Sequence, residues 1–174
     1  ANYPKFASRT MANLHSTAVD GAHMVIGVTT ELYEMNKGII NNDLINIREE
    51  HGDTNWYIAN TCLLYGLDFS ELYRVASEGL NKGEIFPFCL GDYADLFKRE
   101  LAYKKEMNLI LLNTLLVGLV QSLLVVARET GFSYEESLDL NIKKLLKRFP
   151  DKFNETDALE RNLDVEYKVL KGDA

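Results

Sequence analysis

Two pairs of acidic residues stand at helical spacing in the first third of the chain. Glu31 and Glu34 form one pair and Glu50 and Asp53 the other, each spaced i,i+3, with fifteen residues between the pairs. Residues at this spacing lie on one face of a helix, and a short turn would bring the two faces together. Four converging carboxylates repel one another unless protons or a hard cation neutralise them, and oxygen ligands favour magnesium or manganese over zinc. The natural substrate of such a site is a polyphosphate.

The residues between the two pairs support this register. A glycine and a run of Asn and Asp residues separate the pairs, and they predict a turn near Ile40 to Asn42. Glu34 then lies roughly 9 Å before the turn and Glu50 roughly 12 Å after it, so the pairs are nearly level. The alternative is that these are ordinary solvated helix acids, because the spacing does not say which face of each helix is buried.

A basic motif follows near the other end of the chain. The sequence N-I-K-K-L-L-K-R-F-P begins at Asn141, and Asn141, Lys144 and Arg148 share one helical face until Pro150 ends the helix. This directional cationic strip is suited to bind phosphate oxygens. The alternative is a basic C-terminal turn that complements the helix dipole.

In this order, the motifs E-x-x-E, E-x-x-D and N-x-x-K-L-x-x-R-F-P resemble those of a known family. They are similar to the all-α nucleoside triphosphate pyrophosphohydrolases, the MazG-like group that includes the dimeric dUTPases and dCTPases. The resemblance covers about residues 13–67 and 131–150, and the segment from His23 to Glu31 looks like the family's helix before the first acidic pair. It implies a four-helix-bundle-type fold and magnesium-dependent hydrolysis of a nucleoside triphosphate, foremost a deoxynucleoside triphosphate, to the monophosphate and pyrophosphate. The implied purpose is control of the nucleotide pool.

The resemblance also implies a role for each matched residue. The acids would be catalytic and would hold Mg²⁺, or Mn²⁺ in its place, so that a bound water attacks the α-phosphorus. Lys144 and Arg148 would neutralise the leaving pyrophosphate, and Asn141 would contact sugar or phosphate. Tyr57 resembles a family position near the sugar, with a plain core aromatic as the alternative. Further candidates for base stacking or pocket lining are Trp56 and His23.

The chain departs from the family at Thr30, where members often carry a further Glu before the first acidic pair. Loss of that carboxylate leaves a second possibility open, a nucleotide or alarmone sensor or sponge that binds without turnover. A third alternative is a helical interaction protein whose acids decorate the surface. The motifs are compatible with a pyrimidine, a purine or an alarmone as ligand.

More than sixty residues separate the matched blocks, and they resemble a degenerate second copy of the first half. Gly66-Leu-Asp-Phe-Ser-Glu-Leu recurs at Gly131 as Gly-Phe-Ser-Tyr-Glu-Glu-Ser, at an offset of 65, with a Ser cap predicted for each following helix. At an offset of 64, Lys98, Thr114 and Val117 replace three of the four acids, so we expect one complete active site per chain. Two unrelated amphipathic hairpins are the alternative.

The composition fits a single all-α domain. The chain has 174 residues, 47% of them hydrophobic, three prolines and no sustained period-2 alternation. We expect an active half at about 11–81, a second half at about 91–150 and a solvated outer helix at about 155–171 that packs across the bundle or a partner. The predicted helices are 11–40, 43–65, 69–81, 91–107, 109–130, 134–148 and 155–171.

Charge and hydropathy point to a cytoplasmic protein. A net charge of −7 and a pI near 5.0 disfavour duplex nucleic acid as a partner. Leu109–Ala127 carries no charge, but four polar residues interrupt it, so we expect the central helix of a bundle and no membrane contact. Cys62 and Cys89 fit buried free thiols in a reducing cytosol, and the N-terminus lacks an apolar signal core. A homodimer is compatible with these features.

Overall fold

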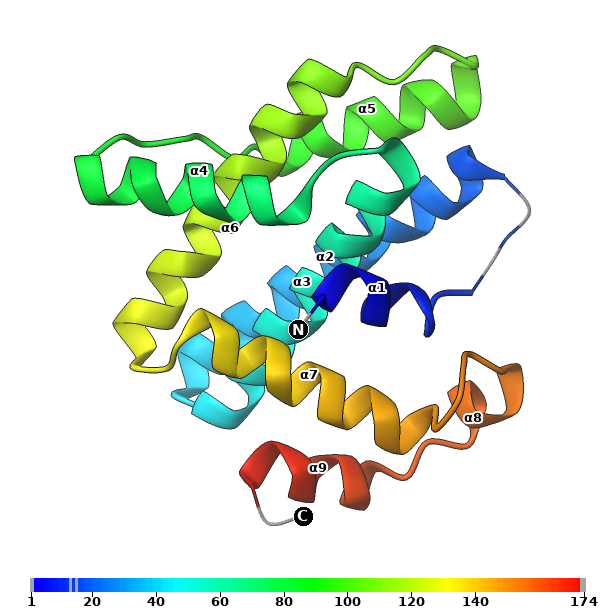
Figure 1. Ribbon diagram of the computed structural model, residues 1–174, viewed down its shortest axis with the longest axis vertical. Helices are drawn as coiled ribbons and strands as arrows, with labels where there is room; N and C mark the ends of the chain where they lie inside the picture. Colours follow the sequence, from blue (N-terminus) through cyan, green and yellow to red (C-terminus); the bar gives the residue numbers. More distant parts are fainter. Residues whose placement is uncertain (1, 13, 15, 173–174) are drawn as a thin grey trace.

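The protein is a bundle of helices. The computed structural model describes residues 2–12, 14 and 16–172, and every regular element among them is helical (Figure 1). The predicted all-α fold class is therefore confirmed. In chain order the helices are α1 (Tyr3–Ser8), α2 (Thr17–Asn41), α3 (Leu44–Tyr65), α4 (Phe69–Lys82), α5 (Leu90–Tyr103), α6 (Leu109–Thr130), α7 (Tyr134–Arg148), α8 (Glu155–Leu159) and α9 (Leu163–Lys171).

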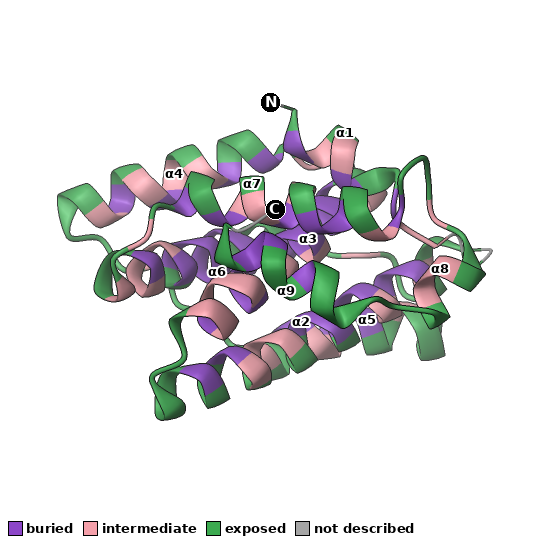
Figure 2. Ribbon diagram, turned by 90° about the horizontal axis from the view of Figure 1, so that it is seen from below, coloured by how far each residue is buried: buried purple, intermediate pink, exposed green. Residues whose placement is uncertain are grey.

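Helix α3 lies at the centre of the bundle. It packs along α2 as a long hairpin and also contacts α1, α4, α6, α7 and α9, while α5 covers α2 and α4 covers α6. Figure 2 shows α3 largely buried between its neighbours. The residues of α3 that point inward include several polar ones, and these bond within the bundle. Examples are Thr54, whose hydroxyl donates to the Glu50 carbonyl at 2.7 Å, and Asn60, which donates to the Trp56 carbonyl at 3.0 Å.

The apolar helix α6 is not the centre that its sequence predicts. It is long and apolar enough to cross a membrane by length and composition alone, and half of its most apolar stretch is buried inside the protein. Its middle is enclosed, but its first turn reaches solvent, where Ile110 is 83% exposed. Helix α3 takes the central place, since it contacts six other helices: α1, α2, α4, α6, α7 and α9.

The turn between α2 and α3 falls where the sequence predicts it. Asn42 adopts a left-handed conformation with φ of 54°, and the Asp43 side chain caps α3 by accepting from the Asn46 amide at 3.1 Å. Such a tight connection leaves the two helices antiparallel and adjacent. The register of the acidic residues across the hairpin is thereby set.

The predicted helices at 69–81, 109–130 and 134–148 match α4, α6 and α7 closely, whereas both ends of the chain differ. The first predicted helix, 11–40, begins only at Thr17, where Ser16 provides the cap, and its positions 13 and 15 lie outside the described residues. A separate short helix, α1, precedes it with Pro4 in its first turn.

The last predicted helix is broken into two. Asn154 caps α8 and Asn162 caps α9 by accepting from the Val165 amide at 3.2 Å, so the chain turns between them. Helix α9 then packs on α7 (Figure 1). The expectation of a solvated helix is wrong for Glu166, which is only 4% exposed.

Both halves contain three helices joined by similar turns. Gly66 and Gly131 end α3 and α6 in left-handed conformations, as the proposed repeat requires. Ser133 caps α7 as predicted, but Asp68 rather than a serine caps α4. Helices α5 and α6 touch only briefly, unlike α2 and α3. The tandem repeat stays a prediction.

The two cysteines differ in environment. Cys62 is a buried free thiol, as predicted. Cys89 is also free but exposed, because it precedes the first turn of α5, so the prediction that it is buried is wrong.

Two glycines allow α2 and α7 to approach α3 closely. A Cβ added at Gly27 would lie 2.1 Å from the ring of Tyr57. A Cβ added at Gly52 would lie 2.8 Å from the carbonyl oxygen of Ser137 and 3.0 Å from the Cβ of Asn141. Side chains on the three helices therefore meet at short range beside these crossings.

We expect Gly52→Ala to lower the free energy of unfolding by about 1 to 3 kcal/mol, because the new methyl group would force α7 away from α3. Chemical denaturation measures this. The matched control is Gly91→Ala in α5, where the added Cβ would have only the Cys89 sulfur near it, at 3.8 Å. That variant should be unchanged or stabilised by up to about 1 kcal/mol. Equal effects of the two substitutions would contradict the close crossing.

Candidate metal and phosphate site

Three of the four predicted acids meet beside the α2–α3 hairpin. One carboxylate oxygen from each of Glu31, Glu50 and Asp53 lies within 4.8 Å of the other two. Glu31 comes from α2 and the other two from adjacent turns of α3. The i,i+3 spacing of Glu50 and Asp53 thus places both on the face of α3 that meets α2, as the sequence predicts.

Glu34 lies outside this group. Its carboxylate pairs with Lys37 at 3.3 Å on the surface, and its side chain is 47% exposed. The buried side of α2 passes through Met35 and Gly38 instead. With Met35 and Gly38 facing inward, Glu31 lies near the inner side of α2, whereas residue 34, about 60° from residue 31 around the axis, falls on the flank.

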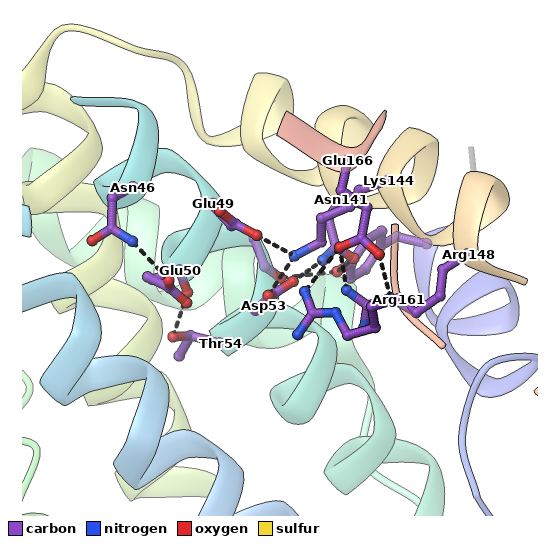
Figure 3. Close-up of polar contacts among 12 residues, drawn as sticks. Asn46, Glu49, Glu50, Asp53, Thr54, Asn141, Lys144, Arg148, Arg161 and Glu166 are labelled. Carbon is purple, nitrogen blue, oxygen red and sulfur yellow. Dashed lines mark hydrogen bonds and ion pairs between the residues drawn. The ribbon is translucent and has the colours of Figure 1, made fainter. Parts of the chain in front are cut away.

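Helix α7 fixes the position of Asp53. Asn141 donates from Nδ2 to one carboxylate oxygen at 2.6 Å, and Lys144 Nζ donates to the other at 2.5 Å. Lys144 also contacts Glu49 at 3.0 Å, and the Tyr3 hydroxyl donates to Asn141 Oδ1 at 2.8 Å. Figure 3 shows Glu49 and Asp53 of α3 converging with Asn141 and Lys144 of α7.

Asn141 and Lys144 are therefore enclosed by the protein. Asn141 is 3% exposed and Lys144 1%. Asn141 Nδ2 bonds to Asp53, and Lys144 Nζ contacts both Asp53 and Glu49. The structure gives them a role that the sequence does not predict, which is to hold the Asp53 carboxylate in place.

Glu50 is the most deeply buried member of the acidic group. Asn46 donates to its carboxylate at 2.9 Å. Burial, the hydrogen bond to Glu31 and the charge of Asp53 raise the pKa of Glu50 from 4.5 to about 9, and burial also raises the pKa of Glu31. Without a cation, this pair of carboxyl groups thus retains a proton at neutral pH.

Two arginines lie on the other side of Asp53. Arg148 makes a two-pronged contact with Glu166, with Nε and Nη2 at 2.8 and 2.5 Å, and Arg161 reaches the same carboxylate at 2.8 Å (Figure 3). Burial alone would raise the pKa of Glu166, but the hydrogen bonds from both arginines outweigh it and lower that pKa to about 2.

A pocket of about 270 Å³ joins the acids, the arginines and the predicted aromatic residues. His23 meets the rings of Trp56 and Tyr57 edge to face, with centroids 6.4 and 5.7 Å apart. Its Nδ1 is buried without a hydrogen-bond partner among the described residues. The residues that line the pocket include His23, Glu31, Asp53, Trp56, Tyr57, Arg148 and Arg161.

A larger cavity of about 830 Å³ lies elsewhere, between α1, the end of α3 and the starts of α4 and α7. Tyr73 and Glu135, two of its polar groups, bond to each other at 2.7 Å. None of the predicted site residues is among the described residues that line it. The smaller pocket is therefore the stronger candidate for chemistry.

Several residues that contact the site lie outside the sequence motifs. Asn46 stands four residues before Glu50, a spacing that allows a helical side-chain contact and could have revealed it. Tyr3, Glu49, Arg161 and Glu166 reach the site only through contacts distant in sequence, for which a single sequence carries no signal.

Comparisons of the chain with protein family models, with curated proteins and with solved structures found no match. The assignment of this site therefore depends on its own geometry and on the motifs in the sequence.

We expect the metal-free protein to lose stability as pH rises from 4.5 towards 9. In that window the folded protein keeps the proton on Glu50 that the unfolded chain releases, so the free energy of unfolding falls with pH. Glu50→Gln should flatten this decline and be the more stable protein near pH 8 to 9. Denaturation in the presence of a chelator at several pH values measures both.

Glu106→Gln, an exposed site, serves as the control and should keep the wild-type decline. A Glu50→Gln variant with the same decline as the wild type would place the retained proton elsewhere.

Proposed function

We propose that this protein hydrolyses a nucleoside triphosphate, foremost a deoxynucleoside triphosphate, to the monophosphate and pyrophosphate with magnesium. The observation that carries the proposal is that three carboxylates, two arginines and three aromatic side chains line or adjoin a single pocket. The motif resemblance to MazG-like pyrophosphohydrolases supports the same assignment.

The donor set suits a hard dication. All three side chains offer carboxylate oxygens, and each of the two on α3 is oriented by an amide side chain, Asn46 for Glu50 and Asn141 for Asp53. Burial and repulsion from neighbouring carboxylates raise the pKa values of Glu31 and Glu50, and a bound cation would favour their charged forms instead. Magnesium held by these three carboxylates would supply Lewis-acid charge for phosphate oxygens and acidify a bound water.

The remaining side chains have different roles in binding the substrate. Lys144 holds Asp53 and Glu49 in place and offsets their repulsion. Arg148 provides planar donors suited to phosphate oxygens. The rings of His23, Trp56 and Tyr57 line the same pocket and pack edge to face, which suits contact with a base and sugar.

The proposal predicts that the wild type with magnesium releases monophosphate and pyrophosphate from at least one of the common nucleoside triphosphates. Glu31→Gln should lower turnover by about 100-fold or more, because an inner ligand is lost, while its metal-free stability holds or rises. The matched control is Glu34→Gln, the same change one helical turn away on an exposed flank, which should keep turnover within about threefold. Product chromatography and thermal unfolding measure the two properties.

Each other outcome selects another function. Thermal protection by magnesium and a triphosphate without product would indicate a nucleotide-binding sensor. Absence of both protection and product would favour an interaction protein. Equal losses in the Glu31 and Glu34 variants would contradict the three-carboxylate site.

A further inference from the structure

The end of the chain forms part of the pocket wall. Residues 151–171, here named the C-terminal strap, contain α8 and α9. The Phe153 amide donates to the Arg9 carbonyl at 2.9 Å at one end of the strap, and α9 packs on α7 at the other. Phe153 and, between these anchors, Ala158 and Arg161 line the pocket that Glu31 and Asp53 also line.

The cations near the acids differ in how much charge they can offer a ligand. Lys144 is buried and contacts two carboxylates, so this local group carries a net negative charge. Arg148 and Arg161 share the single carboxylate of Glu166, so their group carries a net positive charge. An anion entering the pocket is therefore attracted to the arginine pair.

Arg161 also has N–H groups that its contact with Glu166 does not use. A guanidinium carries five N–H groups, and the contact from Arg161 to Glu166 uses Nη2 alone. Its side chain is 41% exposed, compared with 15% for Arg148, so it can reach a ligand without leaving Glu166. Asn162, the next residue, caps α9 and fixes the direction of the backbone there.

Resting on the proposed function, we propose that Arg161 binds the phosphates of the substrate that become pyrophosphate, together with Arg148, and that Lys144 does not. The strap thereby supplies a substrate-binding residue from outside the three sequence motifs. The acids and the arginine pair would contact different parts of one metal–polyphosphate.

The test uses Arg161→Gln and the matched control Lys168→Gln, an equal charge change at an exposed position on the same strap. The probes are inorganic pyrophosphate with magnesium, a nucleoside monophosphate and the hydrolysed triphosphate. Arg161→Gln should weaken pyrophosphate binding and raise KM for the triphosphate, each by roughly tenfold or more, as expected for loss of charge-assisted hydrogen bonds. Monophosphate binding should stay within about twofold, and Arg161→Lys should restore part of the pyrophosphate affinity.

Pyrophosphate binding by Arg161→Gln within twofold of the Lys168→Gln control would overturn the inference, as would equal losses for monophosphate and pyrophosphate or a wild type that binds no pyrophosphate. The proposed function fails separately. Arg161-dependent pyrophosphate binding without hydrolysis supports this site and rejects the enzyme, whereas hydrolysis that ignores Arg161 rejects this site alone.

Discussion

The crowding of three carboxylates at the α2–α3 hairpin is the constraint on which the rest of the structure depends. Like charges within 4.8 Å of one another and partly removed from water are unfavourable without compensation. The protein supplies part of it through Lys144 beside Asp53 and through a proton held by Glu50 and Glu31. The remainder would come from a bound cation. The close crossing of α7 at Gly52 brings Asn141 and Lys144 within reach of Asp53.

The helix at the centre of the bundle, α3, is more polar than α6, which packs nearer the outside. The most apolar helix, α6, has an exposed first turn, while α3 buries histidine, threonine and asparagine side chains at the centre. Those polar groups bond to backbone carbonyls, side chains on α7 or one another, so burial leaves few of them unsatisfied. Hydropathy ranks α6 first because it counts apolar residues. Which helix lies at the centre depends on how many other helices pack against it, and that is set by the tertiary structure.

Helical spacing and turn-forming residues were enough to predict two features of the α2–α3 hairpin. The i,i+3 spacing placed Glu50 and Asp53 together, and the Asn and Asp run located the turn at Asn42. Glu34 was beyond those rules, because the choice between Glu34 and Met35 for the inner side of α2 depends on how α2 rotates against α3. The break before α9 had a visible signal in Asn162, a strong capping residue inside an amphipathic stretch. The contact of Arg161 with Glu166 at the pocket had none, because it depends on the docking of α9 against α7.

We propose that Glu31, Glu50 and Asp53 hold a divalent cation. Crystals grown with Mn²⁺ test it most directly, because anomalous scattering locates manganese independently of any assumption about function. We expect a peak within coordination distance of carboxylate oxygens from all three residues, with Glu34 outside the coordination sphere. The absence of manganese beside these three carboxylates at saturating concentration would contradict the proposal, whether or not manganese is bound elsewhere.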